Sequence, residues 1–350
     1  MVFFLIGLAW MAVGPVLATG YAIYMHRRIH NLYLPRICRI FQEKPLFIVP
    51  RGQPRADAED VRFITSDGLS LHGCYFKTPR PKRRGVIVFG LEFGSDCWSA
   101  WQYCEFLIEK GFDVFSFETR NQGSSQKQSH YDPLQWVTDY EVSDTRAALN
   151  YVKSRPDADP KGVGFFGISK GAGAGMVAAS NDPYVRCCVT DGMFATASTL
   201  IPYMKHWVKI YNANYPAHLI PEWYFRYLAG VALGMVQTER NCHFSSLEKA
   251  IRRFNRPLFM IHGEDDNYIK PEMARSLLKH AKGPHSFWLV QGAKHNQALH
   301  VAGNTYHHRV ERFFADHLDG VPEPRRRLPA ELDQQTLQEA RYCEPALGHG

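Results

Sequence analysis

The stretch GVGFFGISKGAGAGMV, residues 162–177, joins a short apolar run to a glycine-rich run through a single serine. Residues 162–168 are apolar or glycine throughout, as in a buried strand of a parallel sheet. The KGAGAGM that follows predicts the start of a helix. Ser169 therefore stands at a strand-to-helix turn, with Gly167 two positions before it and Gly171 two positions after it. This spacing is typical of a nucleophilic serine held on a sharp turn.

Phosphate binding is the alternative interpretation of this glycine-rich stretch. A phosphate-binding loop of the Walker type ends in Gly-Lys followed by Ser or Thr, whereas here Lys170 follows Ser169. A dinucleotide-binding loop needs the spacing GxGxxG, whereas Gly171, Gly173 and Gly175 are spaced by two throughout. Neither phosphate motif fits, so the serine turn is the better interpretation.

Short apolar runs alternate with amphipathic stretches through most of the chain. We expect an opening hairpin at 61–65 and 70–78, followed by buried strands and helices in turn. The expected strands are 85–91, 112–118, 162–168, 185–192, 257–263 and 285–292, and the expected helices are 99–111, 132–156, 170–180, 271–282 and 304–318. This alternation predicts an α/β fold with a doubly wound, mostly parallel sheet and helices on both faces.

Two polar residues follow later strands at the same edge of the predicted sheet as Ser169. Asp266 lies three residues after Gly263, which ends one strand, and His295 lies three residues after Gly292, which ends the next. The order Ser, Asp, His along the chain is the order of nucleophile, acid and base in one group of α/β enzymes. We expect His295 to take the proton of the serine hydroxyl and Asp266 to hold the imidazole ring.

Other residues compete for these two roles. Asp265 and Glu264 are adjacent alternatives for the acid, and Asp191 ends the strand before a long insertion. Three further histidines lie near the predicted base but do not directly follow a strand: His300, His307 and His308.

Two backbone N–H groups near the serine are expected to bind the negative charge that develops on a carbonyl oxygen. One belongs to Lys170, directly after Ser169, and the other to Leu91, at the end of the apolar run 85–91. We expect the side chain of Lys170 to face solvent at the start of the helix.

Residues 194–248 interrupt the alternation with a stretch that is rich in aromatic residues and contains no clean strand. An insertion of this length is too long for a simple loop and predicts a helical lid. Most of its aromatic side chains are expected to pack on the core, and some to line an apolar cavity over the site. The candidates for substrate binding are Trp207, Tyr211, Trp223 and Phe225.

Residues 2–25 contain no charged residue, and His26, Arg27 and Arg28 follow at once. As a helix this segment spans roughly 36 Å, more than the ~30 Å of hydrocarbon in a bilayer. We therefore predict a transmembrane anchor at 1–25, with the catalytic domain on the cytoplasmic side, where the basic flank lies. A cleaved signal peptide is the alternative, but no positive charge precedes the apolar run.

The remaining domain boundaries follow from these elements. We expect a basic connector at 26–58, an α/β core at 59–193 and 249–320, the lid at 194–248 and a flexible tail at 321–350. The chain of 350 residues, 45% of them hydrophobic, is long enough for one large core.

Composition excludes several classes of function. The eight cysteines form no CxxC pair, so we expect reduced thiols rather than disulfides or a zinc site. The net charge of +7 comes without a nucleic-acid-binding motif, so nucleic acid is not an expected partner. The basic clusters suit an anionic membrane surface instead.

These features resemble the α/β-hydrolase superfamily, specifically the lidded serine hydrolases of the monoacylglycerol-lipase and serine-aminopeptidase type. The resemblance covers roughly residues 60–318 and depends on DGLSLHGCYF (67–76), GISKG (167–171), HGEDDNYI (262–269) and GAKHNQAL (292–299). It implies an eight-stranded sheet, a triad of Ser169, Asp266 and His295, and no metal or organic cofactor.

The chain departs from that pattern in two places. Relatives usually carry His-Gly at the oxyanion turn, where this chain has Phe89-Gly90, and they often carry Asp-x-Arg-Gly-x-Gly-x-Ser where this chain reads FETRNQGSSQ (117–126). The first departure concerns the oxyanion donor, and the second concerns a stretch that we interpret as structural.

We expect a membrane-anchored serine hydrolase that cleaves an acyl ester through a covalent acyl-enzyme. The lid and the anchor favour a lipid-like acyl chain. Alternatives on the same fold are an acyl-CoA thioesterase or acyltransferase, a peptidase, and a non-catalytic binding protein, because a fold does not fix a function.

Overall fold

The computed structural model describes residues 2–44, 49–211 and 220–319, without the side chains of residues 2–12, 209 and 211. It divides into two compact units. The helical unit is Met1–Lys44 and Leu200–Arg240, and the sheet unit is Pro45–Thr199 and Asn241–Gly350. The tail predicted at 321–350 lies outside the described residues.

An eight-stranded sheet forms the centre of the sheet unit, in the order β1-β2-β4-β3-β5-β6-β7-β8. Its strands are β1 (Ala58–Ile64), β2 (Ser70–Phe76), β3 (Gly85–Gly90), β4 (Phe112–Phe117), β5 (Val163–Ile168), β6 (Val185–Asp191), β7 (Leu258–Gly263) and β8 (His285–Val290). β2 pairs antiparallel with β1 and with β4, and all other neighbours are parallel. The predicted mostly parallel sheet is confirmed, with the opening hairpin at one edge.

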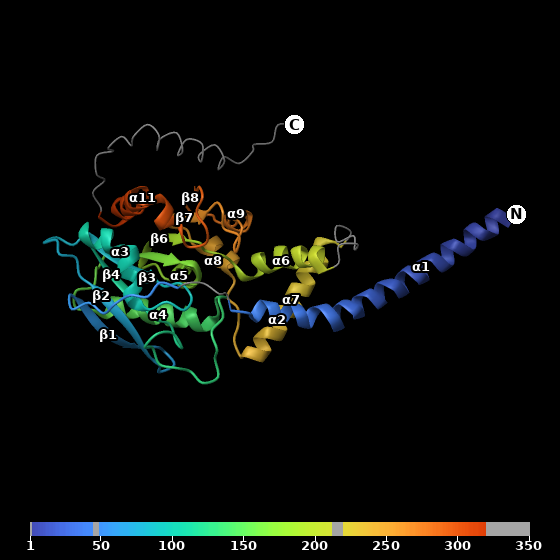
Figure 1. The fold of residues 1–350 in the computed structure, drawn as a ribbon, viewed down its shortest axis with the longest axis horizontal. Coiled ribbons are helices and arrows are strands. Elements are labelled where there is room, and N and C mark those ends of the chain that lie inside the picture. Colours follow the sequence, from blue (N-terminus) through green and yellow to red (C-terminus); the bar gives the residue numbers. More distant parts are fainter. Residues whose placement is uncertain (1, 45–48, 212–219, 320–350) are drawn as a thin grey trace, which may run out of the picture. The chain divides into compact units, whose positions relative to one another are not determined.

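Helices cover both faces of this sheet (Figure 1). One apolar core is shared by the sheet with α3 (Ala100–Glu109), α10 (Ala298–Ala302), α11 (Asn304–Phe314) and the turns η2 (Cys97–Ser99) and η4 (Ala315–Asp319). The other is shared with α4 (Asp139–Ser154), α5 (Ser169–Ser180), α8 (Leu247–Arg253) and α9 (Pro271–Leu278). Because helices cover both faces, β3, β4 and β5 are buried along their whole length. This burial is why β3 and β5 consist of apolar residues and glycine throughout.

The carboxyl ends of the central strands lie side by side. Gly90 of β3 pairs with Gly167 of β5, Ile168 pairs with Asp191 of β6, and Asp191 pairs with Ile261 of β7. The loops that follow β3, β5, β6 and β7 therefore begin at one edge of the sheet, which is the edge where sheets of this type bind ligands.

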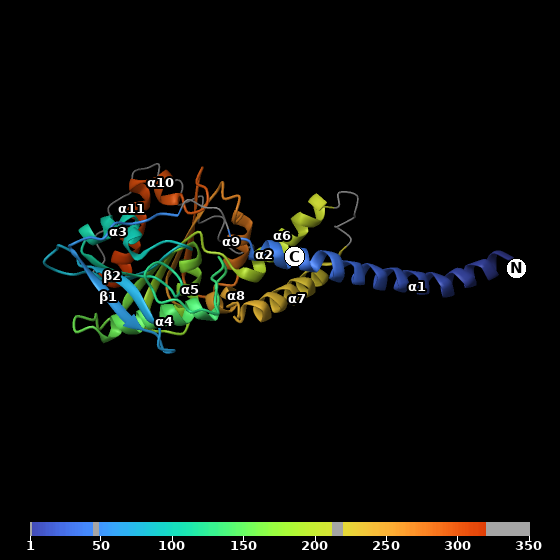
Figure 2. The ribbon, with the colours of Figure 1, turned by 60° about the horizontal axis from the view of Figure 1, so that its bottom comes forward.

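The helical unit is built from segments far apart in the sequence. It contains α1 (Val2–Arg28), the π-helical turn η1 (Ile29–Tyr33), α2 (Leu34–Gln42), most of α6 (Thr196–Tyr211) and α7 (Glu222–Arg240), and α2 packs on α7 (Figure 2).

Helical structure continues to Gln42, through part of the segment 26–58 for which the sequence predicts a connector. The physical reason is an apolar face on α2. Leu34, Cys38 and Phe41, spaced by four and three, are buried, and Cys38 Sγ lies 3.8 Å from the carbonyl oxygen of Ala232 in α7.

α1 contains the apolar segment for which the sequence predicts a transmembrane anchor. A membrane span needs about 20 consecutive, predominantly apolar residues. Among the described residues, no helix combines the length and the apolar character that a crossing requires. The predicted transmembrane helix is therefore not supported.

Candidate active site

Ser169 occupies the turn between β5 and α5 that the sequence predicts. Its φ angle is 50°, a left-handed conformation that few non-glycine residues adopt. Strain of this kind costs about 1–3 kcal/mol and clusters at functional sites. Oγ of Ser169 lies 3.0 Å from Nε2 of His295.

Two glycines allow other backbone segments to approach this turn closely. A Cβ atom on Gly167 would lie 2.5 Å from Cα of Ala172, and one on Gly171 would lie 2.3 Å from the carbonyl carbon of Gly90 and from the carbonyl oxygen of Leu91. Side chains do not tolerate such contacts with backbone, so both positions require glycine. The loop after β3 therefore lies directly against the serine turn.

The structure brings Ser169, His295 and Asp266 together in one hydrogen-bonded row. Nδ1 of His295 lies 2.7 Å from Oδ2 of Asp266, and Nε2 faces the serine hydroxyl. Because a carboxylate only accepts hydrogen bonds, Nδ1 carries the proton and Nε2 is free to accept from the hydroxyl. The side chains of His295 and Asp266 are 7% and 0% exposed, so water competes little for these bonds.

Backbone donors hold the Asp266 carboxylate in place. Oδ1 accepts hydrogen bonds from the N–H of Tyr268 at 2.9 Å and of Ile269 at 2.7 Å, which leaves Oδ2 for His295. The carboxylate is thus oriented before it meets the imidazole, as a group that must hold a ring needs to be.

The residues that compete with Asp266 and His295 have other partners or are exposed. Asp191 is buried, but its Oδ2 accepts a hydrogen bond from the hydroxyl of Tyr306 at 2.9 Å. Burial raises the pKa of Asp191 to about 7, and the Tyr306 hydrogen bond offsets this only in part. Asp265 and Glu264 are exposed. Of the alternative histidines, His300 and His308 are exposed and His307 stacks on Phe106.

Two backbone N–H groups lie beside the serine turn. That of Lys170 belongs to the first turn of α5, so no carbonyl within the helix accepts from it. Leu91 directly follows β3, in the loop that lies against Gly171. Together with the positive end of the α5 dipole, these groups suit an oxygen on which negative charge develops.

The prediction that the Lys170 side chain faces solvent is wrong. It is 6% exposed, and Nζ donates hydrogen bonds to Oε1 of Glu141 at 2.9 Å and to the carbonyl oxygen of Leu134 at 2.6 Å. Glu141 also accepts hydrogen bonds from Tyr131 and Thr138. Burial acts to raise the pKa of Glu141, but the charge of Lys170 and these hydrogen bonds hold that pKa below its ordinary value. Lys170 is buried because α4 supplies this counter-charge.

A second polar link joins the loop after β3 to the loop that carries His295. Glu92 accepts hydrogen bonds from Nδ2 of Asn296 and from the hydroxyl of Tyr103, each at 2.8 Å. Glu92 is buried, and burial raises its pKa. Because Glu92 follows Leu91 and Asn296 follows His295, this link ties the two loops together next to the site. Sequence analysis missed Glu92 and Asn296. The one feature of the sequence that could have indicated them is that each directly follows a predicted site residue.

Aromatic rings pack around the imidazole of His295. The ring of Tyr268 lies 5.2 Å away and that of Phe194 lies 6.2 Å away, both edge-on, and Trp136 packs on Phe194 at 5.6 Å. Phe194 and Trp136 are buried. These rings form an apolar wall that sequence analysis missed. Phe194 lies in an irregular segment, and Trp136 precedes α4, which begins at Asp139 and not at residue 132 as the sequence predicts.

The four residues that we predict to bind substrate lie in the helical unit. Phe225 is buried, and together with Trp207 it lines a cavity inside that unit. Trp223 is 66% exposed, and the side chain of Tyr211 lies outside those that the structure describes. Substrate binding by these residues stays a prediction.

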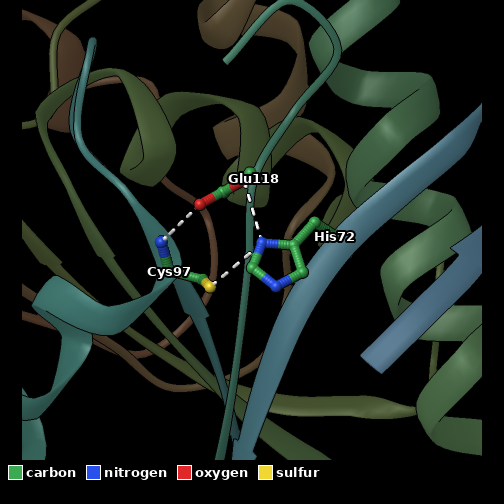
Figure 3. A group of neighbouring side chains, drawn as sticks. All are labelled: His72, Cys97 and Glu118. Atoms are coloured by element: carbon green, nitrogen blue, oxygen red, sulfur yellow. Dashed lines mark hydrogen bonds and ion pairs between the residues drawn. The ribbon is translucent and has the colours of Figure 1, made fainter. Parts of the chain in front are cut away.

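One group in the described residues has the donor types and spacing of a metal site: His72, Cys97 and Glu118 (Figure 3). Nδ1 of His72 lies 3.1 Å from Oε2 of Glu118 and 3.5 Å from Sγ of Cys97, and Nε2 lies 2.8 Å from Oδ1 of Asp60. Hydrogen bonds to Cys97 and Glu118 raise the pKa of His72 to about 10, so the ring is a cation between two carboxylates. His72 thus forms ion pairs with Glu118 and Asp60. Glu118 also accepts hydrogen bonds from the N–H groups of Cys97 and Ser124.

Comparisons with known proteins identify hydrolases among the proteins that this chain is similar to. The model of the dienelactone hydrolase family matches residues 71–191, from β2 to the end of β6. YfhR, an uncharacterized protein of Escherichia coli O157:H7, is 25% identical over 271 residues, which cover 75% of this chain and 82% of YfhR. The thiohydrolase aneE of Aspergillus aculeatus is 26% identical over 133 residues, 37% of this chain and 40% of aneE.

Solved structures share the fold. The esterase Pf2001 of Pyrococcus furiosus has a TM-score of 0.57 at 20% identity and covers 79% of this chain and 99% of its own. Est1E of Butyrivibrio proteoclasticus, solved with ferulic acid bound, has a TM-score of 0.52 at 15% identity and covers 73% of this chain and 99% of its own. The chain has the α/β-hydrolase fold, and it is similar to esterases and thiohydrolases.

Proposed function

We propose that this protein is a serine hydrolase that cleaves a carboxylic ester through an acyl-enzyme intermediate, with Ser169 as nucleophile, His295 as base and Asp266 as the residue that orients the base. The observation that carries this proposal is the unbroken row from Oγ to Nε2 at 3.0 Å and from Nδ1 to the Asp266 carboxylate at 2.7 Å. These distances allow direct proton transfer from the hydroxyl to the imidazole.

In the first half of the reaction, Ser169 Oγ attacks the carbonyl carbon while Nε2 of His295 takes the hydroxyl proton. Asp266 accepts the Nδ1 hydrogen bond and stabilises the imidazolium that forms. The N–H groups of Lys170 and Leu91 bind the carbonyl oxygen as it becomes negative. His295 then gives its proton to the departing alcohol oxygen as the carbon–oxygen bond breaks, which leaves the acyl group on Ser169.

In the second half, water replaces the alcohol. Nε2 of His295 takes one proton from the water as its oxygen attacks the acyl carbon. The same proton passes to Ser169 Oγ as the acyl–oxygen bond to the serine breaks. The products are the free acid and the restored hydroxyl, so each cycle consumes one ester and one water.

A substrate with an apolar acyl group is the class we favour. The support inside the sheet unit is the aromatic wall of Phe194, Tyr268 and Trp136 beside His295, since aromatic rings are common linings of ligand pockets. The aromatic residues predicted for the lid point to the same class. A lipid-like chain is the finer form of this proposal.

Thioester hydrolysis is the second candidate, and a specific observation favours it. The chain is similar to two proteins named thiohydrolases, aneE and one from Eupenicillium brefeldianum. A thioester presents the same carbonyl carbon to Ser169, with sulfur in place of the leaving oxygen. Parallel rates on an ester and a thioester of one acyl chain separate the two functions.

Location is a separate matter. A single-pass membrane location with the catalytic domain facing the cytoplasm stays a prediction from the sequence. Alkaline carbonate extraction of membranes from cells that express the full chain tests it, since a spanning protein stays in the pellet.

Labelling with a fluorophosphonate tests the proposed activity. We expect the full-length protein to be labelled at Ser169, with the label lost in Ser169→Ala and retained in Ser180→Ala, a serine of the same helix α5 whose hydroxyl bonds the carbonyl of Val177. Peptide mapping by mass spectrometry identifies the modified residue. A folded protein that takes no label, with or without added lipid, would instead favour the non-catalytic binding protein.

A further inference from the structure

The helical unit contains a partly open cavity with a volume of about 650 Å³. Small-molecule sites in proteins occupy roughly 300–1,000 Å³. The cavity is lined by the carboxyl-terminal part of α1, by η1 and α2, and by α6 and α7, all within the helical unit. The family model covers residues 71–191 only, so none of these lining residues lies in the matched part of the chain.

The walls of this cavity are apolar. Their apolar side chains include Trp207, Phe225 and Leu228 from α6 and α7, and Ile37 and Ile40 from α2. Phe225 and Leu228 are buried. A chain of CH2 groups that binds between these walls is shielded from water on both sides. Each buried CH2 contributes about 0.8 kcal/mol to the free energy of binding.

Positive charge gathers at the α1–α2 side of the same cavity. Arg28, Arg36 and Arg39 line it, and Glu43 is the one acidic residue among the described residues of its lining. Arg28 donates a hydrogen bond to the hydroxyl of Tyr24 at 2.9 Å. Arg36 and Arg39 are three residues apart on α2 and therefore share one face of that helix.

The guanidinium groups of Arg36 and Arg39 are available to a ligand. Both residues are exposed, and neither has a hydrogen bond or an ion pair with any residue that the structure describes. The ring of Tyr33, 6.0 Å from Arg36, is a neighbour without a charge. A guanidinium stays charged at all physiological pH values and binds a carboxylate through two parallel N–H donors.

We propose that this cavity binds a long-chain carboxylate, with the acyl chain between α2, α6 and α7 and the carboxylate at Arg36 and Arg39. The choice of a carboxylate rests on the proposed function, because cleavage of an acyl ester releases one. The lining residues of the cavity include none of Ser169, Asp266 and His295. It holds the acid that the hydrolase releases.

Binding is measured on the full-length Ser169→Ala protein with undecanoate that carries a dansyl group at its far end. Displacement by unlabelled acids of 8, 10 and 12 carbons then gives their affinities. We expect affinity to rise roughly tenfold for every two added CH2 groups, and dodecanoate to bind at least about tenfold more tightly than dodecanol, because a charge-assisted hydrogen bond is worth 1.5–3 kcal/mol.

Three variants separate the charge from the walls. Arg36→Gln with Arg39→Gln should weaken dodecanoate by at least about tenfold and leave dodecanol unchanged. Arg27→Gln removes the same charge from the neighbouring stretch at a residue that does not line the cavity, and should have no effect. Ile40→Trp fills the cavity and should weaken both ligands.

Several results would overturn the proposal. They are no binding of the dansyl probe, equal affinity for dodecanoate and dodecanol, or an effect of Arg27→Gln as large as that of the Arg36 and Arg39 changes. Displacement of the probe by anionic phospholipid vesicles but not by dodecanoate would assign the site to a phosphate headgroup instead. Because binding is measured on the Ser169→Ala variant and labelling on the protein with Ser169 present, a failure to bind is distinct from a failure of fluorophosphonate labelling.

Discussion

The buried ion pair of Lys170 and Glu141 gives the sharpest test of how the serine turn is held. The change is Lys170→Met, which keeps the length of the side chain and removes its charge. Nζ loses hydrogen bonds to Glu141 and to the Leu134 carbonyl, and the Glu141 carboxylate stays buried without a counter-charge. The two side chains are 6% and 1% exposed, so water cannot replace the lost cation.

The magnitude follows from this burial. Removing one partner of a buried pair typically costs 3–5 kcal/mol. Tyr131 and Thr138 still donate hydrogen bonds to Glu141, which places the expected loss near the lower end, at about 3 kcal/mol at pH 7.5. The matched control is Lys153→Met. Lys153 pairs with Asp182 at 2.5 Å but is 33% exposed, so its loss should cost about 0–1 kcal/mol.

The stability lost in Lys170→Met is expected to depend on pH. In the wild type the pKa of Glu141 lies below its ordinary value, so its charge stabilises the fold above that ordinary pKa. In Lys170→Met, desolvation acts without an opposing cation and raises the pKa of Glu141. The variant then regains stability relative to the wild type as pH falls from 7.5 towards 5, because protonation removes the uncompensated charge.

The assay is urea unfolding, followed by tryptophan fluorescence at pH 7.5 and pH 5. At an m-value of about 3 kcal/mol/M, a loss of 3 kcal/mol lowers the midpoint by about 1 M. Lys170→Met with Glu141→Gln should recover part of the loss. Equal costs for Lys170→Met and Lys153→Met, or a gap between Lys170→Met and the wild type that does not change with pH, would refute the reasoning.

Three further predictions address the site and the residues around it. Asp266→Asn should lower kcat by a factor of roughly 10³–10⁴ with little change in KM or in the urea midpoint. The amide oxygen still accepts the backbone hydrogen bonds, but the amide no longer selects the reactive tautomer of His295. Steady-state ester hydrolysis measures kcat, and a loss of less than tenfold would contradict this prediction. Gly171→Ala should prevent folding or labelling of the serine because its Cβ meets backbone at 2.3 Å, whereas Gly230→Ala, in α7 with no atom within 4 Å, should stabilise by about 0.5–1 kcal/mol. Burial raises the pKa of Asp191 to about 7, so its contribution to the stability of the fold is lost as pH rises from about 4 to 7. Asp191→Asn should therefore become more stable relative to the wild type over that range, as measured by thermal unfolding. A difference in stability that does not change with pH would contradict the raised pKa of Asp191.

The sheet could be predicted from the sequence because its signals are local. The apolar runs of β3 and β5 each lie between turn residues, and burial on both faces makes such runs continuous. The placement of Ser169, Asp266 and His295 was equally local, since each follows a strand whose end the sequence marks with a small or apolar residue.

What the sequence did not reveal depends on pairings between distant segments. Lys170 is buried only because Glu141, 29 residues earlier, faces it from α4. Glu92 and Asn296 meet from loops 204 residues apart. The helix of Leu34–Gln42 has a periodic apolar face in its sequence, but the partner that buries this face, α7, follows almost 190 residues later, so a connector was the simpler expectation.

The serine turn itself shows why these distant pairings matter for function. A non-glycine residue at φ 50° is strained by about 1–3 kcal/mol, and such strain persists only where the surroundings over-determine the backbone. Here the residue after the strained serine is the one whose side chain is anchored by Glu141 and Leu134. The same peptide supplies the N–H that we propose for the oxyanion. We therefore infer that the buried lysine at this position fixes a backbone donor, a role for which its charge needs no contact with the substrate.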